Sequence, residues 1–170
     1  MQNATPLGIK PAERLLQVSI TRQELRLYAA GKPGKTYAVS TSKAPPSNVR
    51  DSLGTPRGLH EIAERIGAGQ PPGMVFVGRV ATGHHYGELS RTENERNLIT
   101  TRILWLRGLE PGVNAGGNVD SHDRYIYIHG TNHEDRIGHP ASGGCVQLRN
   151  LDMLELFESV RVGDWVNIVD

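Results

Sequence analysis

The stretch HGTNHEDRIGHPASGGC, residues 129–145, gathers the side chains of this sequence that could do chemistry. It contains three of the seven histidines and the only cysteine. A cysteine near a histidine is typical of a nucleophile with its base, whereas several histidines with a cysteine are typical of a metal site. Unpaired cysteine is also among the most buried residue types, so a purely structural role is the third interpretation.

The metal interpretation requires His129, His133 and His139, with Cys145 as a further ligand. His129 and His133 are four positions apart, a spacing that aligns side chains only on a helix. Residues 130–132 are Gly-Thr-Asn and follow a strand-like run, which disfavours a helix there. The sequence has neither HExxH nor a second cysteine. We therefore expect no metal and no cofactor, and the roles of the other histidines stay open, including those of His84 and His85.

The nucleophile interpretation uses the glycine-rich turn before the cysteine. Ser142, Gly143 and Gly144 give the backbone unusual freedom, so that the amides of Gly144 and Cys145 could converge on an oxyanion. His129 ends a strand-like run, and the fifteen intervening residues can fold back to bring it near the sulfur. A free thiol has a pKa of about 8.5, and a nearby imidazolium could lower it by about two units.

Composition bounds the partners and the domain organisation. The 170 residues fit a single domain over 1–170, with 37% hydrophobic and 22% charged residues, and the 20 glycines and 10 prolines predict many turns between short strands. A formal charge of +1 without blocks of like charge argues against nucleic acid and against a membrane surface as partners. One cysteine cannot form an internal disulfide.

The opening MQNATPLGIKPAERLLQVSI lacks a basic start followed by an apolar run, and no run elsewhere is long enough to span a bilayer. These patterns predict a cytoplasmic protein, unless an export signal has been removed from the sequence.

Strands must position the loop. Alternating apolar and polar residues predict strands at LLQVSI, ELRLYA and KTYAVS, with a hairpin turn at residues 31–34. After a Pro- and Ser-rich loop, further strands are predicted at LHEIAERI and MVFVGRV, and residues 84–97 read as a surface loop with at most a helical turn.

The strongest strand candidates are LITTRILWLRGL and RYIYIHG, because β-branched and aromatic residues dominate them. The second run ends at His129. After Cys145, Asn150 is a candidate N-cap, and a short amphipathic helix is predicted from the spacing of Leu151, Leu154, Phe157 and Val160. WVNIV is the last predicted strand.

At this point the motifs resemble a known family. IHGTN, then IG, then SGGCVQLRNLDMLELFESVRVGDWVNI resembles the signature of the YkuD-type L,D-transpeptidases, and GTPRGLHEI is similar to the TPxG segment of that family. The resemblance covers residues 55–170. It implies a mostly-β sandwich of mixed sheets, with a short helix after the cysteine and the cysteine in a cleft.

The resemblance also implies catalytic roles. Cys145 would be the nucleophile and His129 its base, and the backbone carbonyl of Gly130 would hold the imidazole, so that no acidic third member is required. Gly144 would contribute its amide beside the sulfur.

Two positions depart from the family pattern. Many relatives have histidine or another long polar residue at Gly143 and arginine at Gln147. The first change opens the cleft beside the sulfur, and the second removes a cation that would hold substrate carboxylates. Arg149 is the candidate replacement, and Ser142, Gly143 and Arg149 form the expected substrate-binding set.

The resemblance implies attack on the amide between the L-centre of a diamino acid and the following D-alanine in a tetrapeptide stem of peptidoglycan. A thioester on Cys145 would then pass to water, in an L,D-carboxypeptidase, or to the amine of another stem, in a transpeptidase. The cytoplasmic expectation favours water and recycled muropeptides. Carbapenems would be covalent inhibitors. An inactive muropeptide-binding module is the alternative, and intact His129 and Cys145 argue against it.

Overall fold

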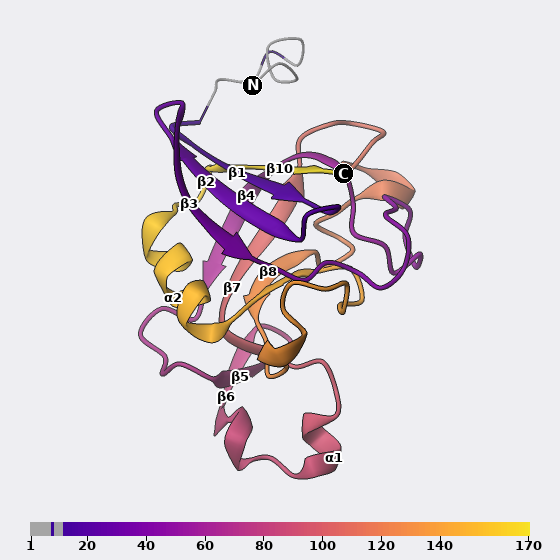
Figure 1. Cartoon of the computed structure of the whole chain (residues 1–170). Helices are drawn as coiled ribbons and strands as arrows, with labels where there is room; N and C mark the ends of the chain where they lie inside the picture. The colour runs from indigo at the N-terminus through magenta and orange to yellow at the C-terminus, as the bar shows by residue number, and fades with distance from the viewer. Residues whose placement is uncertain (1–7, 9–11) are drawn as a thin grey trace.

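The computed structural model describes Gly8 and residues 12–170. The fold is mostly β, with ten strands in one hydrogen-bonded sheet and one two-to-three-turn helix, α2 (Figure 1). Half of the opening stretch that suggested a cytoplasmic location, residues 1–7 and 9–11, lies outside the described residues. Within the described part of the chain, no helix has the length and apolar character needed to span a membrane.

The sheet is mixed. Its strands are β1 (Arg14–Ser19), β2 (Glu24–Ala29), β3 (Lys32–Ala38), β4 (Gly58–Ile66), β5 (Met74–Val77), β6 (Val80–His85), β7 (Ile99–Gly108), β8 (Tyr127–Gly130), β9 (Val146–Leu148) and β10 (Trp165–Val169). The helices are α1 (Arg91–Asn94) and α2 (Asn150–Ser159), with 3₁₀ turns η1 (Tyr86–Glu88), η2 (Gly117–Val119) and η3 (Glu134–Arg136). The strand order is β3-β2-β1-β10-β4-β7-β5-β6, and β8 joins β7 to β9. Of these strand pairs, β1–β10 and β8–β9 are parallel. β10 pairs with β1 on one side and with β4 on the other, so it lies in the middle of the sheet.

Alternation along β7 separates two cores. Leu104 and Leu106 belong to the larger core, where Met153, Leu156 and Phe157 of α2 also pack. The same core contains residues of β1 and β2 together with residues of β8 and β9, so the sheet folds over itself as a sandwich; these are Leu16, Val18, Leu25, Ile128, Val146 and Leu148. The fold class expected from the sequence, mostly β and mixed with a short helix after Cys145, is confirmed.

The opposite face of β7 carries the smaller core. Ile103 packs there with Met74 and Phe76 of β5 and with Tyr127 of β8, and the partly buried Trp105 and Cys145 adjoin them. β5 pairs with β7 in the sheet, and its side chains Met74 and Phe76 pack on the face on which the cysteine lies.

Two details of the predicted strands are wrong. The run MVFVGRV is not one strand, because Gly78 and Arg79 both adopt positive φ (55° and 66°) and turn the chain from β5 into β6. The first hairpin turns at Ala30 and Gly31, with φ of 49° and 74°, so residues 32–34 already belong to β3.

The helix α2 also differs from its prediction. Arg149, rather than Asn150, is the N-cap residue, and no side chain of its own caps the helix. The carboxylate of Glu134 takes that role by accepting a hydrogen bond from the Asn150 amide at 2.7 Å. Leu151 is 74% exposed, so the buried face is formed by Met153 and Leu156 and their neighbours instead.

Candidate active site

The register of β8 and β9 brings the cysteine and the histidine to one face of the sheet. Ile128 pairs with Val146 and His129 with Gln147, so Cys145 lies beside Tyr127. Since neighbouring residues of a strand point to opposite faces, Tyr127, His129 and Cys145 share one face. The Tyr127 amide donates a hydrogen bond to Sγ of Cys145 at 3.3 Å.

His129 is buried and held by the chain itself. Its Nδ1 lies 2.5 Å from the carbonyl oxygen of Gly130, so Nδ1 carries the proton and donates it, and Nε2 is left with a free lone pair. Burial lowers the pKa of the imidazole to about 4, so His129 is neutral near pH 7. A neutral imidazole with a free Nε2 has the form that a general base requires.

Gly130 lies where the backbone has no room for a side chain. A Cβ at this position would be 2.7 Å from the Thr100 carbonyl and 2.8 Å from Oδ1 of Asn150. Asn150 in turn accepts a hydrogen bond from the hydroxyl of Thr100 and donates one to the carbonyl of Thr131. This buried amide therefore fixes the end of β8 against β7 and the start of α2.

The expected lowering of the thiol pKa is wrong. Burial raises the pKa of Cys145 to about 11, against the opposing effects of the Tyr127 hydrogen bond and the charge of Arg124. With His129 neutral as well, the resting pair is a thiol and an imidazole rather than an ion pair. Removal of the thiol proton must then accompany the attack on substrate.

The turn before Cys145 is internally hydrogen-bonded. The hydroxyl of Ser142 donates to the carbonyl of Cys145 at 2.6 Å and accepts from the amide of Gly144 at 3.2 Å. Ser142 therefore shapes the turn, and the Gly144 amide, expected to face an oxyanion, is engaged by that hydroxyl. Gly144 has φ of 133°, a conformation that favours glycine.

A second loop holds this turn. The carbonyl of Thr41 accepts the amides of Ala141 and Ser142 at 2.8 and 3.0 Å. The Ser42 amide donates to the hydroxyl of Thr55 at 3.0 Å, which ties the loop to the TPxG-like segment. That segment is therefore linked to the cysteine turn through residues 41 and 42.

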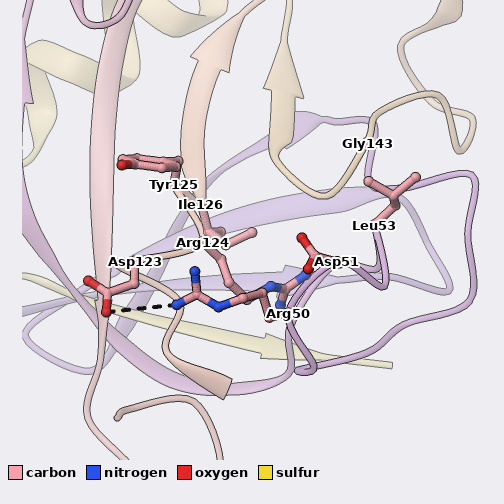
Figure 2. A pocket seen from close by; sticks show the side chains of 8 residues that line it. All are labelled: Arg50, Asp51, Leu53, Asp123, Arg124, Tyr125, Ile126 and Gly143. Atoms are coloured by element: carbon pink, nitrogen blue, oxygen red, sulfur yellow. Dashed lines mark ion pairs between the residues drawn. The ribbon is translucent and has the colours of Figure 1, made fainter. Parts of the chain in front are cut away.

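A pocket of ≈ 200 Å³ opens beside the turn (Figure 2). It is lined by Arg50, Asp51, Leu53, Asp123, Arg124, Tyr125, Ile126 and Gly143. Gly143 is exposed, and a Cβ there would meet nothing within 4 Å, so the missing side chain leaves this side open. Asp51, Leu53 and Tyr125 have φ of 61°, 59° and 56°, and such strained residues cluster at functional sites.

Two arginines, Arg50 and Arg124, line this pocket, and neither was predicted from the sequence. Arg149 is exposed at the start of α2 and does not line the pocket. Arg124 does, and it donates to the carbonyls of Ser47 and Gly54 at 3.1 and 2.7 Å. Burial lowers the pKa of the Arg124 guanidinium, and a negative charge on Cys145 would oppose this effect.

An aromatic wall continues from the cysteine across the sheet. Trp105 pairs with Tyr127 across β7 and β8, and its ring stacks on His122 with centroids 4.0 Å apart. Arg79, from the turn of the β5–β6 hairpin, lies 4.5 Å from the Trp105 centroid and donates to the Tyr127 hydroxyl at 3.1 Å. The sequence offered no signal for this wall, because its members come from three separate segments.

The remaining histidines have other surroundings. Nε2 of His133 lies 2.6 Å from the carbonyl of Asn94, His139 is exposed, and His84 pairs with Glu88 at 3.3 Å. Among Gly8 and residues 12–170, no three side chains of the types His, Cys, Asp and Glu gather in a way that could hold a metal ion.

Solved structures of L,D-transpeptidases have the same fold as this chain. L,D-transpeptidase 3 from Mycobacterium tuberculosis, solved with a faropenem-derived adduct, superposes with a TM-score of 0.58 at 12% identity, over 93% of this chain and 60% of the other. An L,D-transpeptidase solved in complex with imipenem gives a TM-score of 0.55 at 18% identity, over 92% of this chain and 59% of the other.

Two curated proteins with sequence similarity to this chain belong to different classes, an enzyme and a ribosomal protein. The putative L,D-transpeptidase YqjB of Bacillus subtilis is 39% identical over 56 residues, 32% of each chain. The large ribosomal subunit protein uL3 of a Polaromonas species is 34% identical over 133 residues, covering 64% of this chain and 58% of that protein. The chain thus spans less than two thirds of the length of either relative.

The family comparison covers nearly the whole chain. The model of the YkuD L,D-transpeptidase catalytic domain matches residues 13–168, which extends the resemblance beyond residues 55–170 to the first hairpin. It includes β8, which carries His129, and the turn that precedes Cys145. The chain belongs to the YkuD family of L,D-transpeptidase catalytic domains.

Proposed function

We propose that this protein is a cysteine-dependent acyltransferase that acts on the tetrapeptide stems of peptidoglycan. Its scissile bond is the amide between the L-centre of the diamino acid and the terminal D-alanine. The observation that carries the proposal is the placement of Cys145 and His129 on one face, with Nδ1 of His129 bound to the Gly130 carbonyl. Membership of the family supplies the substrate class.

In the first half-reaction, Nε2 of His129 takes the thiol proton as Sγ of Cys145 attacks the scissile carbonyl. A tetrahedral oxyanion forms and collapses, the carbon–nitrogen bond breaks, and the imidazolium returns its proton to the departing amine of D-alanine. Concerted transfer suits this pair, because burial disfavours the charged forms of both side chains. The product is a thioester between Cys145 and the shortened stem.

In the second half-reaction an acceptor attacks the thioester. We propose that water is the main acceptor, which makes the protein an L,D-carboxypeptidase that acts on muropeptides. The supporting observation is Gly143, an exposed position with open space where a Cβ would lie, next to the turn that holds the sulfur. An amine acceptor would instead give cross-linked stems.

A single incubation tests both steps. The protein is mixed with a disaccharide tetrapeptide, and free D-alanine, tripeptide and cross-linked dimer are followed by mass spectrometry while the stem concentration is raised. We expect D-alanine and tripeptide in equal amounts with little dimer. Dimer that comes to dominate would identify a transpeptidase, and absence of D-alanine release would contradict the acyltransferase proposal itself.

We further propose that carbapenems and related β-lactams acylate Cys145. Solved proteins of the same fold carry imipenem or a faropenem-derived adduct. A strained lactam carbonyl would present the same electrophile to Sγ as the stem amide does.

The similarity to uL3 does not lead us to propose a ribosomal role. Binding to RNA rests on an excess of Lys and Arg arranged to meet phosphates. This chain has 19 basic and 18 acidic residues.

A further inference from the structure

Among the described residues, Arg124 forms no ion pair within 4 Å, although the charge of Asp51, which lines the same pocket, acts on it. Its hydrogen bonds go to the carbonyls of Ser47 and Gly54 and to the hydroxyl of Ser52, all of them neutral acceptors. A guanidinium has five N–H donors, so these three bonds leave two unassigned. The neighbouring Arg50 differs, since its guanidinium is 3.9 Å from the carboxylate of Asp123 (Figure 2).

Several contacts place this cation beside the cysteine. The Gly54 carbonyl, 2.7 Å from Nη2 of Arg124, is also 3.5 Å from the position of a Cβ on Gly144. From the other direction, Sγ of Cys145 lies 3.5 Å from the carbonyl of Tyr125, the residue after Arg124. Arg124 and Gly143 line the same pocket, on the open side of the cysteine turn.

We propose that Arg124 is a specificity-determining residue that binds the free carboxylate of the terminal D-residue of the stem. The proposal rests on the proposed function, because it takes the bond attacked by Cys145 as the one that precedes this residue. The carboxylate carbon is then three bonds from the attacked carbonyl, at most about 4 Å away. Gln147, where the resemblance to the family implies an arginine, is neutral and buried beside His129, and in this proposal Arg124 supplies the charge instead.

The bonds of Arg124 to the loop also make it a rigid anion site. Three neutral acceptors hold the guanidinium plane in place without neutralising its charge. A stem that ends in a carboxylate gains charge-assisted hydrogen bonds there, and a stem that ends in a carboxamide does not. We expect the wild-type protein to favour the carboxylate by about 10- to 100-fold in kcat/KM.

The first experiment needs no peptidoglycan substrate. Iodoacetate and iodoacetamide alkylate a thiolate by the same displacement of iodide, but only iodoacetate carries a carboxylate. We expect the ratio of their rates on Cys145 to exceed the ratio on N-acetylcysteine amide by about 10-fold. Arg124→Gln should abolish the excess, Arg124→Lys should retain most of it, and Arg50→Gln should reduce it less. Wild-type protein without an excess, or an unchanged excess in folded Arg124→Gln, would overturn the proposal.

Arg124→Gln loses bonds to residues 47–54 and is checked for folding by its thermal transition. If it does not fold, Arg124→Lys decides the question, because lysine lacks the forked guanidinium and keeps the positive charge. An iodoacetate excess that disappears in this variant would overturn a charge-based role.

The second experiment compares turnover of the stem with turnover of its C-terminal carboxamide. Discrimination between the two stems that survives Arg124→Gln contradicts the proposal. If the wild-type protein shows the iodoacetate excess but turns over neither stem, the proposed function is contradicted and the anion site is still supported.

Discussion

The Tyr127 amide donates to the sulfur of Cys145 over 3.3 Å, so the strand that carries the base also holds the nucleophile. Tyr127 and His129 are two positions apart on β8 and point to the same face. The nucleophile and the base are therefore positioned by one four-residue strand and the turn beside it, rather than by distant loops.

Cys145→Ala should remove covalent chemistry from the protein. Incubation of the wild-type protein with a carbapenem should add one inhibitor mass, measured on the intact protein, and the alanine variant should show no addition. An adduct that persists in Cys145→Ala would place the acylation on another residue.

His129→Gln should slow the acylation of Cys145 by about 10²- to 10⁴-fold, the usual effect of losing a positioned base. His133→Ala is the matched control: this histidine follows the same strand but faces the Asn94 carbonyl, and the variant should keep most of the activity. Equal losses in both variants would revive the metal interpretation, which elemental analysis for zinc would then check.

The resting thiol should be protonated over the physiological range. Since burial raises the pKa of Cys145 to about 11 and leaves His129 neutral, the rate of alkylation by iodoacetamide should keep rising with pH toward that value. Stopped-flow or mass-spectrometric rates between pH 5 and the alkaline limit of the fold measure it. A plateau that begins below pH 7 would indicate a preformed thiolate–imidazolium pair.

Replacement by alanine should lower the stability of the protein at one glycine of the site and leave it unchanged at another. Gly130→Ala places a methyl group 2.7 Å from the Thr100 carbonyl, so it should lower the free energy of unfolding by about 1–3 kcal/mol and displace the carbonyl that holds His129. Gly143→Ala meets open space and should leave stability within about 0.5 kcal/mol. Urea titrations of both variants test the pair, and a Gly130→Ala protein as stable as wild type would contradict the close approach.

Stability should decrease as the pH falls from about 6.5 to 4. His60 is fully buried between the Gly58 carbonyl and the Ser121 hydroxyl, and burial lowers its pKa to about 4, as it does for His129. In this range the unfolded chain binds protons that the folded protein does not, so each group contributes stability that is lost on acidification, up to about 3 kcal/mol. His60→Gln should reduce the slope of stability against pH, and a flat wild-type profile would be the contrary result.

The sequence predicted what is local. Cys145 and His129 were singled out because a glycine-rich turn and a strand end mark them within seventeen residues, and their catalytic roles stay a prediction. The place of Arg124 in the pocket was not predicted, because it depends on carbonyls that lie 70 or more positions earlier in the chain. The thiol pKa was misjudged for a related reason: the burial that sets it comes from packing against β5 and β7, which spacing does not reveal.

The helix error also comes from packing, whereas the hairpin error is local. Leu151 fits the helical period, but the direction from which the sheet covers α2 selects Met153 and Leu156 instead. The strand predicted at MVFVGRV is interrupted by positive φ at Gly78 and Arg79, and Gly78 was the only sequence signal of this turn.

The central place of β10 has a consequence for how the molecule forms. In β10, Trp165 pairs with Leu15 of β1, and the other side of β10 pairs with residues 58–61 of β4. The middle of the sheet is therefore closed by segments that are far apart in sequence. Contacts of this kind give a high contact order, for which slow folding is the rule. Until β10 inserts, β1 and β4 each present an unpaired inner edge, and another chain can add there. An intermediate that lacked β10 would therefore be prone to self-association, so dilution during refolding should favour the native form.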